Sequence, residues 1–257
     1  MDRFALNSKV RSVSVIMPVY NEEANLKAAV AGISRTLEYF EKSELIIVES
    51  NSTDSSRDIL QNLDHAWSSK VVLKTIYEDV PKGKGHALRA GLLEVSSEVI
   101  VIYDADEEYS HSDLLILIEP LELGEASFVL GSRNGMKGPM RQFEGDRARS
   151  TLYNLGHLIF TGWFNFLFGT QLKDPFTMWK VFRIGILSEL DLTANRFDID
   201  WELLGKSARL GCKISEIPIT YSARGFSEGK KVRTFLDPLN WIIFSIKYRF
   251  TPLNLKK

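Results

Sequence analysis

The sequence of 257 residues has one cysteine, Cys212, and almost no net charge. A single cysteine excludes an internal disulfide and a cysteine-rich zinc site, and it suits a reducing compartment, so we expect a cytoplasmic protein. The 32 basic and 33 acidic residues leave a formal charge of −1. This balance gives no electrostatic footprint for nucleic acid, and we expect no nucleic-acid partner. The first residues, MDRFALNSKVRS, lack the apolar core of a secretion signal.

Long apolar runs are scarce as well. The run that comes nearest to transmembrane length is residues 152–170, LYNLGHLIFTGWFNFLFGT. It contains Asn154, His157 and Asn165 besides three glycines. We therefore expect a helix in the core or at a membrane interface rather than a membrane span.

Short apolar runs alternate with helical periodicity through the first half of the chain. Strands are expected over residues 13–17, 45–48, 71–76, 99–103 and 127–130, and helices over residues 22–40, 54–63, 86–94 and 112–122. Strands that alternate with helices of this length predict βαβ units and a parallel sheet. Right-handed crossovers place helices on both faces of such a sheet. We therefore predict an α/β fold with three layers, α/β/α, around a mostly parallel central sheet.

The second half of the chain is less regular. Residues 136–149 are polar and predict a loop. Two further strands are expected over residues 176–182 and 214–221, and a helix over residues 202–210 that Gly211 ends. No internal repeat or low-complexity linker marks a second independent domain.

The end of the chain is basic and aromatic. Its basic residues are Arg224, Lys230, Lys231, Arg233, Lys247, Arg249, Lys256 and Lys257, opposed by Glu228 and Asp237 alone. Phe226, Phe235, Trp241, Phe244, Tyr248 and Phe250 lie among them. Such a segment suits an anionic membrane surface, and it equally suits a tail that packs on the body of the protein or on a partner subunit.

Two carboxylates follow the apolar run Val99–Ile102, in the order Tyr103-Asp104-Ala105-Asp106. If the chain stays extended here, Asp104 and Asp106 point to one side and repel each other unless a cation lies between them. In open α/β sheets, ligands bind outside the carboxyl ends of the strands. The pair therefore indicates a divalent metal that carries a phosphorylated ligand, although a solvated acidic turn is also consistent with it.

Polar motifs follow the other expected strands. Pro18-Val19-Tyr20-Asn21-Glu22 comes after the first strand, and Glu49 to Asp54 comes after the second. Lys82-Gly83-Lys84-Gly85 precedes a helix, where glycines would let backbone N–H groups approach a phosphate. Arg133 ends the fifth strand and is suited to clamp a phosphate. Each motif alone is also consistent with an ordinary strand-to-helix turn.

The second half contributes further charged candidates. These are Asp174, Asp198, Asp200 and Glu202, and a basic loop with glycines from Tyr221 to Lys231. The loop could close over an anionic substrate, or it could be a solvated loop.

In their order and spacing, these motifs resemble family 2 glycosyltransferases of GT-A fold. Within that family the chain is similar to the dolichyl-phosphate mannose synthase and polyprenyl-phosphate glycosyltransferase branch. The resemblance runs from about Ser12 to Arg233. It implies a single GT-A domain over residues 1–233, with a nucleotide-sugar-binding half over about 12–133 and an acceptor half over 134–233. Residues 234–257 are then the basic, aromatic tail.

The resemblance also implies roles for the residues that match. Asp104 and Asp106 would hold Mg²⁺ or Mn²⁺ on the donor diphosphate, and Glu108 stands where the family often has a further glutamine ligand. The base and ribose would lie against Pro18, Tyr20, Glu22 and Glu49. Lys84 and Arg133 would meet donor phosphates, and Arg224 and Lys230 would meet the donor diphosphate or the acceptor phosphate, with Asp174 also on the acceptor side.

Two motifs depart from the family pattern. The family usually has two adjacent aspartates after the second strand, and this chain has Glu49-Ser50. The late loop often reads Arg-x-x-Gly-x-Ser-Lys, whereas here it reads RGFSEGKK from Arg224. The choice of nucleotide, a GDP- or a UDP-sugar, and the acceptor contacts therefore stay open.

The implied reaction is an inverting transfer of a sugar to a polyprenyl phosphate, with the metal and the Arg and Lys groups stabilising the charge of the leaving diphosphate. The alternative acceptor is a glycan or another hydroxyl in cell-surface polysaccharide assembly. A hydroxyl acceptor needs a base, for which Asp200 and Glu202 are the candidates and Asp174 is the reserve.

Two other classes of protein fit less well. A nucleotidyltransferase would need a glycine-rich, basic loop after the first strand, where Pro18–Glu22 stands, and a non-catalytic scaffold would not need Asp104, Asp106, Lys84 and Arg133. We expect peripheral association with the cytoplasmic face of a membrane through residues 152–168 and 236–250.

Overall fold

The structure is a computed structural model, and it describes residues 2–133, 147–223 and 236–253. The strands are β1 (Ser12–Val19), β2 (Lys42–Glu49), β3 (Val72–Tyr77), β4 (Val99–Ile102), β5 (Phe128–Ser132), β6 (Lys180–Arg183) and β7 (Ile214–Pro218). The helices are α1 (Leu26–Leu37), α2 (Ser56–Ala66), α3 (Lys84–Leu92), α4 (Leu114–Glu122), α5 (Arg147–Phe168), α6 (Ile199–Arg209) and α7 (Leu236–Phe250). Two 3₁₀ turns, η1 (His111–Asp113) and η3 (Ile184–Glu189), complete the described elements.

The seven strands form one sheet in the order β3-β2-β1-β4-β6-β5-β7. All neighbouring pairs are parallel except those of β6, which runs antiparallel to β4 and to β5. The predicted, mostly parallel sheet is confirmed. The reversed strand was not predicted, because a four-residue strand carries no sequence mark of its direction.

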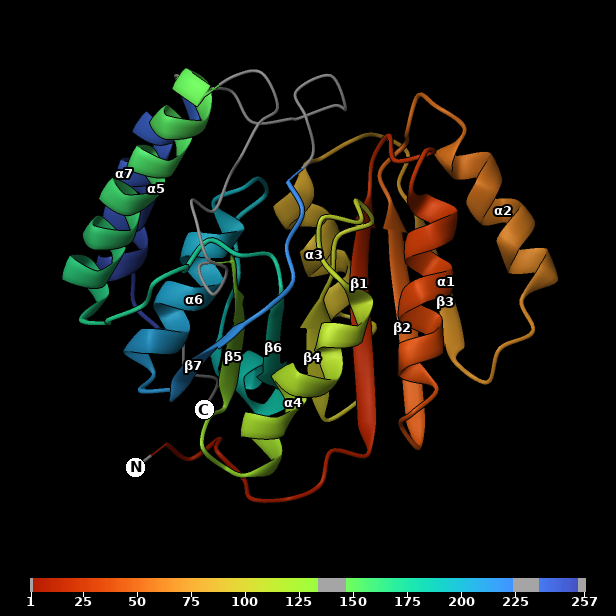
Figure 1. Cartoon of the computed structure of the whole chain (residues 1–257), viewed down its shortest axis with the longest axis horizontal. Helices are drawn as coiled ribbons and strands as arrows, with labels where there is room; N and C mark the ends of the chain where they lie inside the picture. Colours follow the sequence, from red (N-terminus) through yellow and green to blue (C-terminus); the bar gives the residue numbers. More distant parts are fainter. Residues whose placement is uncertain (1, 134–146, 224–235, 254–257) are drawn as a thin grey trace.

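Side chains of alternate strand residues enter two separate cores, one on each face of the sheet. Val13, Val15 and Met17 of β1 pack with α1 and α4, whereas Ile16 packs on the other side with Leu88 of α3 and with α6. This alternation follows from the two-residue period of a strand. It gives the predicted three-layer α/β/α arrangement, with α1 and α4 in front of the sheet and α3 behind it in Figure 1.

The helices cover the sheet because their apolar residues recur at helical spacing. In α1, the buried positions Leu26, Val30, Ile33 and Leu37 recur every three or four residues and so share one face. The helix predicted over residues 22–40 is present but shorter, and residues 22–25 form turns before it. The predicted helices and strands of both halves are all present, with ends that shift by a few residues.

The two helices α5 and α7 lie side by side at the edge of the molecule, next to α6 (Figure 1). Trp163 of α5 donates a hydrogen bond to Ser245 of α7 at 2.9 Å, and Tyr248 of α7 donates one to Asp198 before α6 at 2.6 Å. The described part of the tail therefore packs on the body of the protein. No helix in the described ranges is both long and apolar enough to cross a membrane. The division into residues 1–233 and 234–257 stays a prediction.

Glu44, near the amino-terminal end of β2, is a buried carboxylate. Glu44 of β2 accepts hydrogen bonds from Ser14 at 2.6 Å and from the backbone and side chain of Ser96, and it pairs with Lys74 at 2.9 Å. Burial alone would raise the pKa of Glu44, but the hydrogen bonds from Ser14, Lys74 and Ser96 outweigh it. Together they lower the pKa from 4.5 to about 2.

Glu44 should therefore contribute to a pH-dependent stability. Because its pKa is lower in the folded state, its contribution is complete above about pH 4.5 and is lost as the pH falls toward 2. We expect Glu44→Gln to lower the free energy of unfolding at pH 7 by about 3 kcal/mol and to flatten its pH dependence between pH 4.5 and 2. Urea unfolding of both proteins across this range measures the effect, and an unchanged slope would refute it.

Candidate active site

The loops after β1 and β2 are bound to each other at the carboxyl edge of the sheet. The Asn21 amide donates to the Ser52 hydroxyl at 3.0 Å, and the Asn21 side chain accepts from the Thr53 amide at 2.8 Å. Asn21 and Asn51 both adopt left-handed backbone conformations, which asparagine tolerates better than most residues. The predicted base-contacting residues Pro18, Tyr20 and Glu22 lie half-buried at this edge.

Glu49, the last residue of β2, lies beneath these loops. Its carboxylate is completely buried, accepts a hydrogen bond from the Ser52 amide at 2.6 Å and pairs with Arg57. Arg57 in turn stacks over the Tyr77 ring at 5.4 Å. The structure therefore places Glu49 where it shapes the loop, and its predicted contact with a base or ribose stays a prediction.

The glycines of the Lys82–Gly85 segment allow a close approach of another part of the chain. A Cβ atom on Gly85 would lie 2.7 Å from the Ala194 carbonyl oxygen and 2.8 Å from that of Arg196. The His86 amide donates to the Asn195 carbonyl at 3.1 Å. The glycines thus allow the start of α3 to pack against residues 194–196. Contact of these backbone N–H groups with a phosphate stays a prediction.

Asp104 and Asp106 follow β4, at the centre of the carboxyl edge. The Lys84 ammonium lies 2.6 Å from Asp104 Oδ2 and links the start of α3 to the end of β4. The chain turns at residues 105–106, and Glu107 has a positive φ of 57°. The segment is therefore not extended through Asp106, in contrast to the assumption made from the sequence.

This turn brings the Glu108 amide to Asp106 Oδ1, to which it donates a hydrogen bond at 3.1 Å. The Glu108 carboxylate accepts a hydrogen bond from Tyr221 at 2.9 Å. Within the ranges that the structure describes, no three or more His, Cys, Asp or Glu side chains are gathered so that they could hold a metal ion. The predicted ligand set of Asp104, Asp106 and Glu108 is therefore not assembled here.

Asp104 and Asp106 nevertheless fit Mg²⁺ or Mn²⁺. Mg²⁺ in phosphate-transfer sites is commonly held by one or two carboxylates together with substrate phosphates and water, so a complete protein cage is not required. The Lys84 ammonium at Asp104 shows that this carboxylate already attracts a cation. These two residues are the ones that would hold the ion.

Arg133, which follows β5, forms a buried ion pair with Asp174. Its backbone N–H and Nε donate to Asp174 Oδ2 at 2.9 and 2.8 Å, and Nη2 donates to Oδ1 at 2.7 Å. Asp174 is completely buried, and Arg133 is 5% exposed. Burial alone would raise the pKa of Asp174, but the Arg133 guanidinium outweighs it and lowers this pKa below its usual range.

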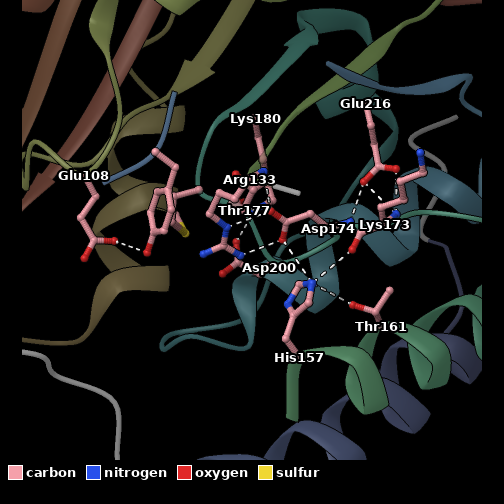
Figure 2. A network of polar contacts seen from close by, with 12 residues as sticks. Glu108, Arg133, His157, Thr161, Lys173, Asp174, Thr177, Lys180, Asp200 and Glu216 are labelled. Carbon is pink, nitrogen blue, oxygen red and sulfur yellow. Dashed lines mark hydrogen bonds and ion pairs between the residues drawn. The ribbon is translucent and has the colours of Figure 1, made fainter. Parts of the chain in front are cut away.

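Asp174 also joins two further elements, β7 and α5, to the site, as Figure 2 shows. Its backbone N–H donates to Glu216 of β7 at 2.6 Å. On the other side, His157 of α5 places Nε2 at 3.8 Å from Asp174 Oδ1 and at 3.1 Å from the Lys173 carbonyl oxygen. The orientation of Arg133 thus depends on β7 and α5 as well as on β5.

A chain of aromatic contacts runs from Arg133 to the segment that follows Asp106. The Arg133 guanidinium lies over the Tyr221 ring at 5.4 Å, and the Tyr221 hydroxyl donates to Glu108. Tyr221 also packs against Tyr109 with 5.3 Å between ring centroids. The aspartate segment and Arg133 are therefore parts of one packed unit.

The remaining carboxylates predicted as bases are paired with lysines. Asp200, in the first turn of α6, accepts from the buried Lys180 at 2.7 Å. Glu202 is completely buried, pairs with Lys206 at 2.7 Å and accepts hydrogen bonds from Thr193 and from the Ala194 amide. Glu202 therefore fixes residues 193–194. Of the two residues, Asp200 is the one whose charge acts on Lys84, and it helps to raise the pKa of the Lys84 ammonium.

Two predicted site residues, Arg224 and Lys230, lie outside the described residues. Tyr221 was predicted at the start of the basic loop, but the sequence did not identify His157 or Lys180 as neighbours of the site. His157 could have been noticed as a single histidine within an apolar helix, whereas Lys180 has no distinguishing pattern.

The ion pair of Arg133 and Asp174 gives a stability prediction. Asp174→Asn leaves the Arg133 charge buried without its partner, and we expect the free energy of unfolding to fall by about 3 kcal/mol or more. Asp79→Asn removes an exposed carboxylate and should change it by less than about 0.5 kcal/mol. Chemical denaturation measures both, and equal stabilities of the two variants would contradict the importance of the pair.

The sequence was compared with known families and proteins. The model of the family described as "Glycosyl transferase family 2" matches residues 14–184. The chain is 29% identical to a dolichol-phosphate mannosyltransferase of Pyrococcus furiosus over 92% of its own length, but it spans only 64% of that protein. It is 26% identical to a UDP-N-acetylglucosamine–dolichyl-phosphate N-acetylglucosaminyltransferase of Methanococcus voltae, over 95% of this chain and 97% of that protein.

A solved structure shares the fold. Glucosyl-3-phosphoglycerate synthase of Mycobacterium tuberculosis, in complex with Mn²⁺, UDP and phosphoglyceric acid, superimposes with a TM-score of 0.66 at 20% sequence identity. The match covers 94% of this chain and 80% of that one. The likeness establishes a GT-A type of three-layer fold.

Proposed function

This chain belongs to glycosyl transferase family 2, and we propose that it transfers a sugar from a nucleoside diphosphate donor to a polyprenyl phosphate. The observation that carries the proposal is the position of Asp104 and Asp106 at the carboxyl end of β4, with Lys84 beside Asp104 and Arg133 at the carboxyl end of β5. Relatives named for dolichyl-phosphate and undecaprenyl-phosphate transfer support this class of acceptor.

The donor would lie along the carboxyl ends of β1, β2 and β4. Pro18, Tyr20, Glu22 and Glu49 stand at the ends of β1 and β2, where we place the base and ribose. Asp104 and Asp106 would hold Mg²⁺ or Mn²⁺ at the diphosphate, as the metal-bound UDP complexes of similar fold suggest. GDP- and UDP-sugars are both candidates, and one relative is named for a UDP-sugar donor, UDP-N-acetylglucosamine.

The reaction needs charge stabilisation above all. Departure of the nucleoside diphosphate builds negative charge on the leaving oxygen, and a bound metal ion supplies Lewis-acid stabilisation of that charge. Lys84 is the nearby cation whose side chain can reach out to the diphosphate. Arg133, held by Asp174, presents a fixed positive field at the same edge. Attack by the acceptor from the opposite side of the sugar would invert the anomeric centre.

The state of the carboxylates favours a phosphate acceptor. A hydroxyl acceptor needs a carboxylate base within hydrogen-bond reach. Each of the three candidates is already paired with a cation: Asp174 with Arg133, Asp200 with Lys180 and Glu202 with Lys206. A phosphate acceptor is already an anion and does not need such a base.

Transfer to a glycan or another hydroxyl is the alternative function. Asp200 is the best candidate base for that reaction, because its side chain is 12% exposed whereas those of Asp174 and Glu202 are completely buried. Arg224 and Lys230 remain the proposed contacts of the acceptor phosphate.

An apolar surface on α5 and α7 supports contact with a lipid bilayer. Its exposed apolar residues are Leu152, Leu155, Leu158, Ile159, Phe166, Ile242, Ile243, Ile246 and Phe250. Lys247, near the end of α7, is exposed beside them. Apolar side chains together with basic residues suit the interface of an anionic membrane. We propose that the protein binds peripherally, with this surface against the lipid.

The transfer reaction can be tested with radiolabelled GDP- and UDP-sugars, Mn²⁺ or Mg²⁺, and a short prenyl phosphate. We expect label in the organic phase with one donor. Asp104→Asn or Asp106→Asn should lower the rate at least about 100-fold, because each removes charge that holds the metal. Glu107→Gln, which changes an exposed carboxylate of the same segment, is the matched control and should retain activity.

The outcome separates the two acceptor classes. Transfer to the prenyl phosphate but not to the corresponding prenyl alcohol or to sugars supports the proposal. Transfer to a sugar hydroxyl alone would establish the alternative, and unchanged turnover in both aspartate variants would refute the metal role.

Membrane contact can be tested with anionic liposomes. Leu158→Glu and Ile243→Glu each place a charge on the exposed surface of α5 or α7, and the double variant should reduce co-sedimentation at least about tenfold. Leu93→Glu, at a still more exposed leucine outside both helices, should bind like the wild type. Failure of the wild-type protein to bind such liposomes at low salt would contradict the proposal.

A further inference from the structure

We propose that Lys84 is the counter-ion of Asp104 before ligands bind, and that it exchanges Asp104 for the donor diphosphate when metal and donor enter. Lys84 would then be a switch that makes the binding of metal and nucleotide depend on each other. The inference rests on the proposed function, because it takes Asp104 as a metal ligand.

The geometry places Lys84 in competition with a metal ion. Its Nζ lies 2.6 Å from Asp104 Oδ2, and the two side chains are 16% and 15% exposed. This partial burial makes the pair stronger than one on the open surface. The ammonium repels a divalent ion that approaches the same carboxylate, so the two cations compete for Asp104.

Lys84 keeps its charge in this environment. A lysine is ordinarily protonated at neutral pH, and the Asp104 carboxylate at 2.6 Å favours the charged form. The competing group is therefore a full cation at neutral pH. Its neighbours are carboxylates, so a divalent ion at Asp104 would replace its attraction there with repulsion.

The backbone around Lys84 allows the side chain to move while the helix stays in place. Gly83 and Gly85 hold the start of α3 against residues 194–196, and the His86 amide is bound to Asn195. From this fixed base, the flexible four-carbon side chain of Lys84 would exchange partners by changing its own rotamer. The diphosphate of a donor offers the negative charge that such a displaced ammonium needs.

Two consequences follow for binding. A metal ion that binds without nucleotide displaces Lys84 from Asp104 and offers it no diphosphate in exchange. The affinity of the protein for the metal alone is therefore reduced. When the nucleotide is present, Lys84 gains a partner, and the two ligands therefore favour each other by the same factor, as thermodynamic linkage requires.

The test measures Mn²⁺ affinity of the full chain without nucleotide, by electron paramagnetic resonance or calorimetry. Lys84→Met removes the competing cation and should tighten Mn²⁺ binding about fivefold or more. Lys84→Arg retains the cation and should bind Mn²⁺ like the wild type. Lys82→Met removes an exposed lysine two residues away and controls for the change in net charge. In EDTA, GDP or UDP should bind Lys84→Met more weakly than the wild type.

The results distinguish this inference from the proposed function. Equal or weaker Mn²⁺ binding by Lys84→Met, with a melting temperature like that of the wild type, overturns the switch. An equal gain in Lys82→Met would also overturn it, because the effect would then be one of net charge. If Asp104→Asn binds Mn²⁺ as the wild type does, the metal role itself fails, and with it the proposed function.

Discussion

Asp174 must remain charged in a place that water does not reach, and the pairing with Arg133 makes this possible. The pair lies where β5 ends, and its two carboxylate oxygens receive three hydrogen bonds from Arg133. A buried charge without a partner greatly lowers the free energy of unfolding, so the elements around the pair must keep this arrangement. Glu216 of β7 fixes the Asp174 backbone, and Tyr221 carries the contact from Arg133 on to Glu108 (Figure 2). The segment around Asp174 is thereby positioned at the edge of the sheet that carries Asp104.

The two halves of the site use their cations differently. Arg133 is locked in a bidentate pair and contributes a fixed field, whereas Lys84 makes one contact, with Asp104, through a flexible side chain. Helix α5 connects this chemistry with the proposed lipid surface. His157 faces the Asp174 carboxylate on one side of α5, and Leu155, Leu158 and Ile159 are exposed on another. A lipid acceptor held at the membrane would thus stand next to the helix that supports the buried pair.

The sequence predicted the architecture because its periodicity is strong where the sheet is buried. The run Val99–Ile102 could only be a buried strand, and the order of motifs was sufficient to indicate the family. The reversed direction of β6 was not predictable, since it depends on how α5 returns the chain to the sheet. Side-chain partners were also beyond the sequence. Glu202 and Asp200 are two residues apart and both acidic, yet one holds a backbone segment and the other lies beside Lys84. Only the packing of α6 against residues 193–196 distinguishes them.

The central claim is that the carboxyl edge of the sheet binds a metal–nucleoside diphosphate complex. A thermal-shift panel of GDP-, UDP- and dTDP-sugars, each with and without Mn²⁺ or Mg²⁺, tests it most directly. A ligand that binds the folded state at 100 times its dissociation constant adds about 2.7 kcal/mol of stability, which gives a readable rise in melting temperature. We expect such a rise for one nucleotide class and only when the metal is present. No rise with any donor, or an equal rise without metal, would contradict it.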